Sequence, residues 1–304
     1  MNKKINLVRA LVVDDSAFMR RLLTDLLESS GQIKVVGIAR NGIDAVAKNQ
    51  RLLPDVITLD VEMPEMDGLR ALTELMRTRP VPVVMLSSLT QSGARETIEA
   101  LSRGAIDFVG KPSSPQEVLA SELRQEIIDK VLNAAQVEVA KLTPFTPPPA
   151  VIPAISQPRP LPASGEDVRL VAIGTSTGGP RALHKVMEQL KPDGKTAYLV
   201  VQHMPKGFTR SLAERLDSIS ELTISEATEG PVEPDHVYIA PGDYHLNTHM
   251  IQGRPHIYLT QTAPVNGHRP AVDVLFNSLA AQPGLCRVAV ILTGMGSDGA
   301  KGLA

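Results

Sequence analysis

The 304-residue sequence contains one cysteine, no tryptophan and only 3% aromatic residues. A single cysteine excludes a disulfide framework within the chain, so apolar cores must supply the stability. Cys286 lies in an apolar run over residues 285–292, where we expect its small side chain to be buried. No stretch approaches the ~18 uninterrupted apolar residues of a membrane-spanning helix, and the N-terminus lacks a long apolar signal region. We therefore expect a cytoplasmic protein that does not insert into a membrane.

The sequence also lacks an excess of either charge. Lys and Arg total 31 against 33 Asp and Glu, a net charge of −2. A nearly neutral chain has no general electrostatic attraction to nucleic acid, so we expect no nucleic-acid partner. Hydrophobic residues make up 43% of the chain and charged residues 21%, as in globular proteins, and 304 residues exceed the usual size of one domain. We expect two domains, each with its own core.

Short apolar runs alternate with amphipathic segments over residues 1–142. This alternation predicts five strands separated by helices, and therefore a parallel sheet covered by helices on both faces. Side chains that carry function should then follow the carboxyl ends of the strands. The expected strands are residues 10–13, 34–38, 55–59, 82–86 and 106–109.

Proline is concentrated in residues 143–167, which we interpret as an extended linker. The alternation of strands and helices starts again in residues 168–304. The sequence thus predicts two doubly wound parallel-sheet α/β domains joined by this linker. The strands expected in the second domain include residues 168–173, 197–201, 237–240 and 288–292.

Three carboxylates follow expected strands of the first domain: Asp14 and Asp15 after the first strand, and Asp60 after the third. Carboxylates a few ångströms apart repel one another unless a cation neutralises them, and oxygen ligands suit Mg²⁺. Lys111 and Ser87 follow the fifth and fourth strands. This set suits transfer of a phosphoryl group to Asp60, with Lys111 pairing with the phosphoryl oxygens and Ser87 bonding the new phosphate.

Three segments of the first domain resemble the receiver domain of two-component response regulators. The resemblance implies a flavodoxin-like fold, phosphorylation of Asp60 by a chemotaxis histidine kinase, and Mg²⁺ bound by Asp15, Asp60 and the carbonyl of Glu62. Phe108 would take the place of the aromatic switch residue. The segments are residues 12–16, 59–68 and 109–112.

A glycine-rich turn in the second domain matches the pattern G-x-S-x-G. Gly174 and Gly178 flank Ser176 between an expected strand and an expected helix. Small flanking residues allow the sharp turn that presents a nucleophilic hydroxyl, and a helix N-terminus favours an oxyanion. The same geometry also cradles phosphates in nucleotide-binding sheets, so the turn by itself leaves both interpretations open.

Two further residues past strand ends favour the nucleophile. His203 would accept the proton of Ser176, and Asp298 would hold the imidazole in the tautomer that can accept it. The chain order of Ser, His and Asp differs from that of α/β-hydrolases, so we expect a different α/β fold. A histidine on a loop is usually just solvated, but His268 lies in a polar turn where it could line the site mouth with Arg269.

Four segments of the second domain resemble the catalytic domain of the chemotaxis protein-glutamate methylesterases. The resemblance implies hydrolysis of glutamate methyl esters on the cytoplasmic helices of chemoreceptors, without a cofactor, and some members also deamidate glutamines. The amides of Thr177 and Met295 would donate to the oxyanion. Because the family continues past its aspartate, we expect this domain to be incomplete at its C-terminal end. The segments are residues 172–180, 201–205, 264–270 and 292–299.

Two other output functions agree less well with the sequence. A DNA-binding output should be basic, whereas residues 168–304 hold 12 Lys and Arg against 12 Asp and Glu. A nucleotide-binding output would have no need of His203 and Asp298. The domain order further suggests the hypothesis that the unphosphorylated receiver covers the esterase mouth and that phosphorylation weakens this packing.

Overall fold

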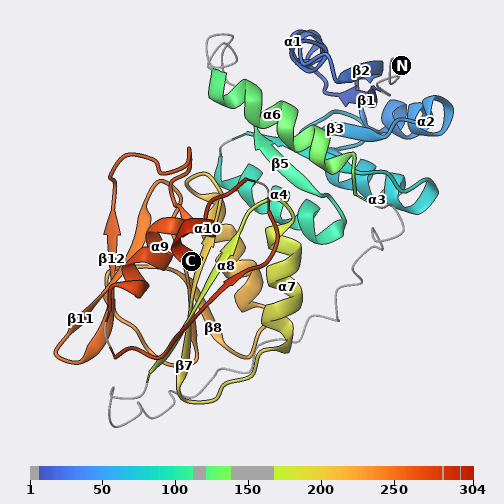
Figure 1. The fold of residues 1–304 in the computed structure, drawn as a ribbon. Helices are drawn as coiled ribbons and strands as arrows, with labels where there is room; N and C mark the ends of the chain where they lie inside the picture. Colours follow the sequence, from blue (N-terminus) through green and yellow to red (C-terminus); the bar gives the residue numbers. More distant parts are fainter. Residues whose placement is uncertain (1–6, 89, 112–120, 138–167, 283, 295) are drawn as a thin grey trace. The chain divides into compact units, whose positions relative to one another are not determined.

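The computed structural model describes residues 7–88, 90–111, 121–137, 168–282, 284–294 and 296–304. The chain divides into two compact units, Met1–Thr146 and Pro147–Ala304, each with its own sheet (Figure 1). The linker predicted over residues 143–167 lies outside the described residues. No helix in the described part of the chain is both long and apolar enough to cross a bilayer.

The first unit contains a parallel sheet in the strand order β2-β1-β3-β4-β5. Every residue of β3 and β4 is buried, because these central strands are covered on both faces. From β1 the chain first adds β2 on one side, and then adds β3, β4 and β5 on the other side. The point between β1 and β3 is therefore the topological switch point, where open α/β sheets bind their ligands. The strands are β1 (Val8–Val13), β2 (Ile33–Ala39), β3 (Val56–Asp60), β4 (Val83–Ser87) and β5 (Asp107–Gly110).

Five helices in the described part of this unit cover the sheet. The helix α1 contacts α6, whereas α2 contacts α3 and α3 contacts α4, so two groups of helices pack on the two faces. Four of the helices begin at a residue whose side chain accepts an amide hydrogen bond, namely Ser16, Asn41, Asp67 and Thr90. The helices are α1 (Ala17–Glu28), α2 (Gly42–Leu52), α3 (Gly68–Thr78), α4 (Gln91–Arg103) and α6 (Ser121–Ala134).

The second unit contains another parallel sheet, in the order β13-β6-β7-β10-β8. The predicted fold class of two doubly wound parallel-sheet units is confirmed. Because β6 lies between β13 and β7, the carboxyl ends of these three strands are neighbours. The strands are β6 (Arg169–Thr175), β7 (Thr196–Gln202), β8 (Thr223–Glu226), β10 (His236–Ile239) and β13 (Arg287–Ile291).

An antiparallel sheet, which the sequence analysis missed, packs beside the parallel one. It consists of β11 (His245–Ile251), β12 (Arg254–Thr260) and the short β9 (Gly230–Pro231). Gln252 and Gly253 form the turn of the hairpin with φ of 50° and 78°, and such a two-residue turn is a recognisable hairpin signal. The helices of this unit are α7 (Gly179–Gln189), α8 (Phe208–Asp217), α9 (Val272–Ala280) and α10 (Ala300–Leu303).

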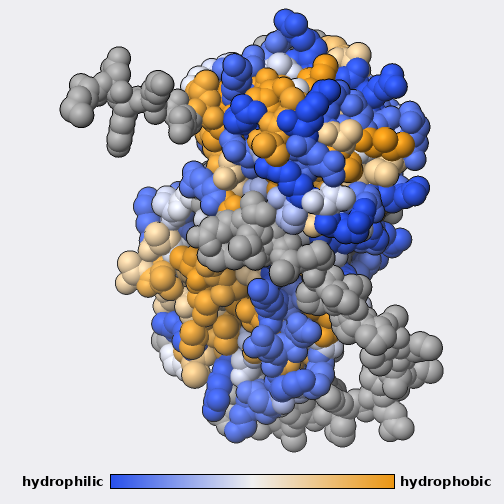
Figure 2. Space-filling view, turned by 90° about the vertical axis from the view of Figure 1, so that its right-hand side faces the viewer, coloured by the Kyte–Doolittle hydropathy of each residue, from blue (hydrophilic) through white to orange (hydrophobic). Residues whose placement is uncertain are grey.

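One packing prediction is wrong: Cys286 is exposed. It precedes β13, which lies at the edge of the described sheet and whose residues Val288 and Ile291 are 55% and 43% exposed. The burial was expected from the apolar run alone, and an apolar run cannot distinguish a central strand from an edge strand. Both units show apolar residues among polar ones on the face drawn in Figure 2.

Candidate active site and phosphorylation site

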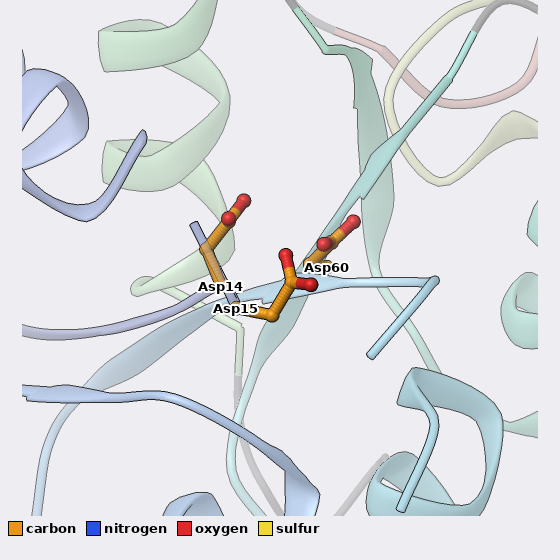
Figure 3. A group of neighbouring side chains, drawn as sticks. All are labelled: Asp14, Asp15 and Asp60. Carbon is orange, nitrogen blue, oxygen red and sulfur yellow. The ribbon is translucent and has the colours of Figure 1, made fainter. Parts of the chain in front are cut away.

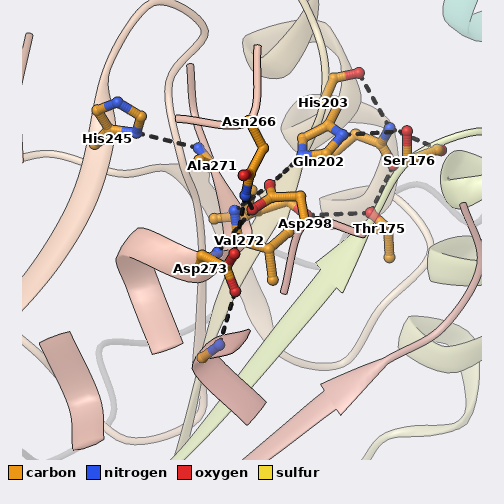
Figure 4. A network of polar contacts seen from close by, with 12 residues as sticks. Thr175, Ser176, Gln202, His203, His245, Asn266, Ala271, Val272, Asp273 and Asp298 are labelled. Atoms are coloured by element: carbon orange, nitrogen blue, oxygen red, sulfur yellow. Dashed lines mark hydrogen bonds and ion pairs between the residues drawn. The ribbon is translucent and has the colours of Figure 1, made fainter. Parts of the chain in front are cut away.

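Ser176, His203 and Asp298 come together at the carboxyl edge of the second sheet (Figure 4). Ser176 directly follows β6, His203 directly follows the neighbouring β7, and Asp298 lies in the segment that follows β13. The His203 Nδ1 atom is 3.2 Å from the Ser176 Oγ atom, and Nε2 is 2.8 Å from Asp298 Oδ2. The side chains of His203 and Asp298 are only 9% and 3% exposed. The structure thus brings together the three residues that the sequence analysis selected.

The two ring contacts of His203 define its tautomer. Ionised Asp298 can only accept a hydrogen bond, so Nε2 carries the proton. The lone pair of Nδ1 then faces the Ser176 hydroxyl and can take its proton. This is the arrangement that a general base requires.

The N-terminus of α9 holds the Asp298 carboxylate. The amides of Val272 and Asp273 donate to it at 2.7 and 3.0 Å, and Ala271, the residue before the helix, supplies no side-chain cap. Burial by itself would raise the pKa of Asp298, but hydrogen bonds from His203, these two amides and Asn266 outweigh it and hold the pKa well below its usual range. Asp298 is therefore ionised at neutral pH.

The turn after β6 packs tightly against the segment after β13. The Ser176 amide donates to the Thr293 carbonyl at 2.8 Å, so this amide is already committed. A Cβ atom on Gly294 would lie 2.8 Å from the Ser176 Cβ atom, which is why only glycine fits there. Thr177 lies just before the N-terminus of α7, and its role as an oxyanion donor stays a prediction. Met295, the second predicted donor, lies outside the described residues.

Gln202 and Asn266 are site residues that the sequence analysis missed. The Gln202 side chain accepts from Thr175 Oγ1 at 2.6 Å and donates to the Ser176 and His203 carbonyls at 3.0 and 3.3 Å. Asn266 Nδ2 donates to Asp298 Oδ1 at 3.0 Å. The position of Gln202 between an apolar strand and His203 is a usable sequence signal. Nothing in the local sequence ties Asn266 to a carboxylate 32 residues away.

The two substrate-site candidates, His268 and Arg269, differ in what they contact. The His268 ring stacks on the His203 ring, with centroids 3.8 Å apart and planes 14° from parallel. The Arg269 guanidinium forms an ion pair with Asp243 and donates to the Thr262 carbonyl at 2.9 Å. His268 therefore belongs to the site, whereas the charge of Arg269 is already paired within the fold.

In the first unit, Asp14, Asp15 and Asp60 converge at the switch point between β1 and β3 (Figure 3). One oxygen of each carboxylate lies within 4.8 Å of the others. Lys111 Nζ, which follows β5, is 2.9 Å from Asp14 Oδ2 and 2.8 Å from Asp60 Oδ2. Oxygen donors at this spacing fit a Mg²⁺ ion.

Burial and the neighbouring charges alter the pKa values of Asp60 and Lys111. Burial raises the pKa of Asp60 to about 6, with repulsion from Asp14 and Asp15 in the same direction and the hydrogen bond from Lys111 opposing it. Burial would lower the pKa of Lys111, but its bonds to Asp60 and Asp14 raise it overall. The cluster thus carries excess negative charge that one lysine neutralises only in part.

The remaining receiver candidates lie in or just after β3, β4 and β5. The Ser87 hydroxyl is buried and donates to the Gly93 carbonyl at 3.0 Å. Phe108 is 2% exposed, and Lys130 lies against it with Nζ 5.2 Å from the ring centroid. Glu62 is exposed and lines a cleft of about 570 Å³ together with Asp15 and Glu96. The roles of Ser87, Phe108 and the Glu62 carbonyl stay predictions.

Two family models match the chain: the response regulator receiver domain over residues 10–122 and the CheB methylesterase over residues 171–304. Proteins named protein-glutamate methylesterase/protein-glutamine glutaminase are close relatives. The one from Halalkalibacterium halodurans is 47% identical over 97% of this chain and 84% of its own length, and the one from Geobacillus kaustophilus is 51% identical over the same shares. The solved catalytic domain of CheB methylesterase from Thermotoga maritima is 48% identical, covering 44% of this chain and 72% of its own, with a TM-score of 0.43.

Fold, sites and comparisons define a response regulator whose output unit is an α/β domain of the methylesterase class. More specifically, the chain belongs to the protein-glutamate methylesterase/protein-glutamine glutaminase family. Both resemblances stated from the sequence motifs are confirmed.

Proposed function

We propose that this protein is a phosphorylation-activated esterase that hydrolyses glutamate methyl esters on chemoreceptors and releases methanol. The observation that carries the proposal is the continuous chain of contacts from Ser176 Oγ through the His203 ring to Asp298. A phosphate-binding turn would not require this relay, because a helix N-terminus alone suffices to bind phosphate.

The first half of the reaction acylates Ser176. Its Oγ atom attacks the ester carbonyl while His203 Nδ1 takes the hydroxyl proton, and Asp298 stabilises the resulting imidazolium. Backbone amides would stabilise the tetrahedral oxyanion, and those of Thr177 and Met295 are the candidates. His203 then returns its proton to the methoxy oxygen, the C–O bond breaks, and methanol leaves.

The second half releases free glutamate. Water attacks the acyl-serine, His203 takes a proton from that water, and the proton returns to Ser176 Oγ as the acyl bond breaks. A glutamine side chain would form the same acyl-serine with ammonia as the leaving group. The same residues therefore serve both activities in the family name.

The receiver unit controls this esterase through Asp60. A carboxylate oxygen of Asp60 attacks the phosphorus of a phosphohistidine on a chemotaxis histidine kinase, and the phosphorus–nitrogen bond breaks. Asp14, Asp15 and Asp60, with the Glu62 carbonyl, would hold Mg²⁺, which when bound neutralises negative charge around the phosphoryl group. Lys111 pairs with the phosphoryl oxygens, and Ser87 must exchange its bond to Gly93 for one to the phosphate.

Kinase, receptor helices and enzyme must meet in one compartment. Because methylated receptor helices are cytoplasmic, we place this protein in the cytoplasm. The equal numbers of basic and acidic residues over 168–304 support a protein rather than a nucleic acid as its partner.

Methanol release from methyl-labelled receptor membranes tests the proposal, in combination with labelling by a fluorophosphonate probe and peptide mass mapping. We expect the probe on Ser176 and no methanol from Ser176→Ala. Ser218→Ala is a matched control, since this serine ends α8 and its hydroxyl donates to the Arg215 carbonyl. Methanol release that survives Ser176→Ala would contradict the assignment.

A further inference from the structure

The turn formed by Val265 to His268 lies against two members of the Ser176–His203–Asp298 triad. Val265 and His268 exchange two backbone hydrogen bonds of 3.0 and 2.9 Å, which closes a two-residue turn. Asn266 and Gly267, the residues at its tip, have φ of 53° and 80°. Asparagine and glycine tolerate this left-handed conformation best, so the local sequence suits this turn.

Two side chains of the turn, those of Asn266 and His268, contact different triad members. Asn266 Nδ2 donates to Asp298 Oδ1 at 3.0 Å and to Asp273 Oδ2 at 2.9 Å (Figure 4). The His268 ring lies flat on the His203 ring at 3.8 Å. One tight turn therefore contacts both the base and the carboxylate that orients it.

The base of the turn is anchored to the neighbouring segments. The Arg269 guanidinium is bound by the Asp243 carboxylate and by the carbonyls of Gln261 and Thr262. The Arg269 carbonyl in turn accepts from the Asp243 amide at 3.1 Å. Anchoring on both the side chain and the backbone keeps His268 at a defined distance from His203.

We propose that His268 is a positioning residue, which holds the His203 imidazole in the plane that joins Ser176 Oγ and Asp298. This inference rests on the proposed function of the triad. The Cβ–Cγ torsion of a histidine has a broad range, so the ring can rotate unless a flat neighbour covers it. Asp298 fixes one nitrogen at 2.8 Å, but the contact from Nδ1 to Ser176 is longer, at 3.2 Å, and is more easily lost.

The test compares variants of the full chain in methanol release, in the rate of fluorophosphonate labelling at Ser176, and in thermal unfolding. We expect His268→Ala to lower kcat and the labelling rate about 10- to 100-fold, because small misplacements of a catalytic group cost this much. KM should change little, since His268 acts on the base and not on substrate binding. His268→Phe keeps a flat ring and should recover most of the rate.

Two further variants complete the design. His268→Asn keeps a polar side chain but no ring, and we expect it to stay as slow as His268→Ala. His249→Ala, on β11 and outside the site, is the matched control and should behave like the wild type. Thermal unfolding identifies any variant that is slow because it is unfolded. The rate of a folded His268→Phe then shows whether a flat ring at this position is sufficient.

Wild-type rates in a folded His268→Ala would overturn the proposal. So would recovery by His268→Asn but not by His268→Phe, because that result would assign a hydrogen bond rather than ring stacking. A wild-type protein that is labelled at Ser176 yet releases no methanol would contradict the proposed function instead. In that case the ratio of labelling rates would still decide the role of His268.

Discussion

At the scale of single residues, the two functional aspartates have opposite environments. Asp298 is buried but receives four hydrogen bonds, so its pKa is depressed. Asp60 is buried beside two other carboxylates and has one lysine donor, so its pKa is raised to about 6. The environment of Asp298 keeps a negative charge beside a histidine. The environment of Asp60 destabilises its charge, so binding of a cation or transfer of a phosphoryl group relieves the repulsion.

Asp298→Asn should lower kcat about 10³- to 10⁴-fold, because an amide can donate to Nε2 and favour the tautomer whose Nδ1 already carries a proton. The loss should appear in methanol release with little change in KM. In the wild type, Asp298 stays ionised down to pH 4 and below, so its contribution to stability is lost only in stronger acid. Any fall in rate between pH 8 and 5 must then come from a group other than this carboxyl.

Asp60→Asn should stabilise the receiver unit at pH 7 in the absence of Mg²⁺. Since the pKa of Asp60 is raised in the folded state, its stability contribution is present below about pH 4 and is lost as the pH rises through about 6. The neutral variant avoids this loss, on the order of 1–3 kcal/mol. Lys111 keeps its ion pair with Asp14.

Thermal unfolding with and without Mg²⁺ checks this expectation. The advantage of Asp60→Asn should vanish near pH 4 and shrink when Mg²⁺ binds the wild-type carboxylates. A variant that is less stable than the wild type at pH 7 without Mg²⁺ would contradict it.

At the scale of elements, the start of α7 and the end of β7 pack on either side of the turn that carries Ser176. Gly179, the first residue of α7, faces Gln202, the last residue of β7. A Cβ atom at Gly179 would lie 1.9 Å from Gln202 Oε1 and 2.9 Å from Thr175 Cβ. This close approach lets the Gln202 side chain reach the carbonyls of Ser176 and His203.

Gly179→Ala should destabilise the second unit by about 1–3 kcal/mol and lower esterase activity, because the added methyl displaces Gln202. Denaturant unfolding and methanol release measure the two effects. Adding Gln202→Ala removes the clashing group, so the double variant should be less destabilised than the sum of the single variants. Strict additivity would show that the clash with Gln202 is not the cause.

At the scale of the whole molecule, two units of the same fold class carry different chemistry at the same place, past the carboxyl ends of their strands. In the receiver unit, that edge gathers carboxylates and a lysine. In the esterase unit, it gathers a hydroxyl, an imidazole and a carboxylate. Coupling between the units requires that phosphorylation change the relative stability of active and inactive arrangements.

A small phosphoryl donor such as acetyl phosphate, with Mg²⁺, should raise methanol release by the full chain about 5- to 150-fold, the usual range of coupling between two sites. Asp60→Asn should abolish the response and keep the basal rate. Asp25→Asn is the control, since this aspartate on α1 is exposed and pairs with Arg21. Equal rates with and without the donor would end the idea that the receiver regulates the esterase.

Much of this architecture was predictable because strand and helix periodicities are local. Parallel strands bring the residues that follow their ends to one edge of the sheet. Strand positions alone therefore predicted that Asp14 lies near Asp60 in the first unit and that Ser176 lies near His203 in the second. The antiparallel sheet was missed, although the turn at Gln252 and Gly253 marks its hairpin. The burial of Cys286 was predicted wrongly because hydrophobicity does not tell where a strand lies in its sheet.

The sequence by itself determined the two α/β units, the phosphorylation candidate and the three members of the triad, since each depends on a short motif and its distance from a strand end. Only the tertiary structure decided which nitrogen of His203 faces Ser176, that α9 holds Asp298, and that Asn266 and His268 reach the triad. These contacts join residues that are far apart in the chain. Their geometry depends on how separate elements pack, which no local pattern encodes.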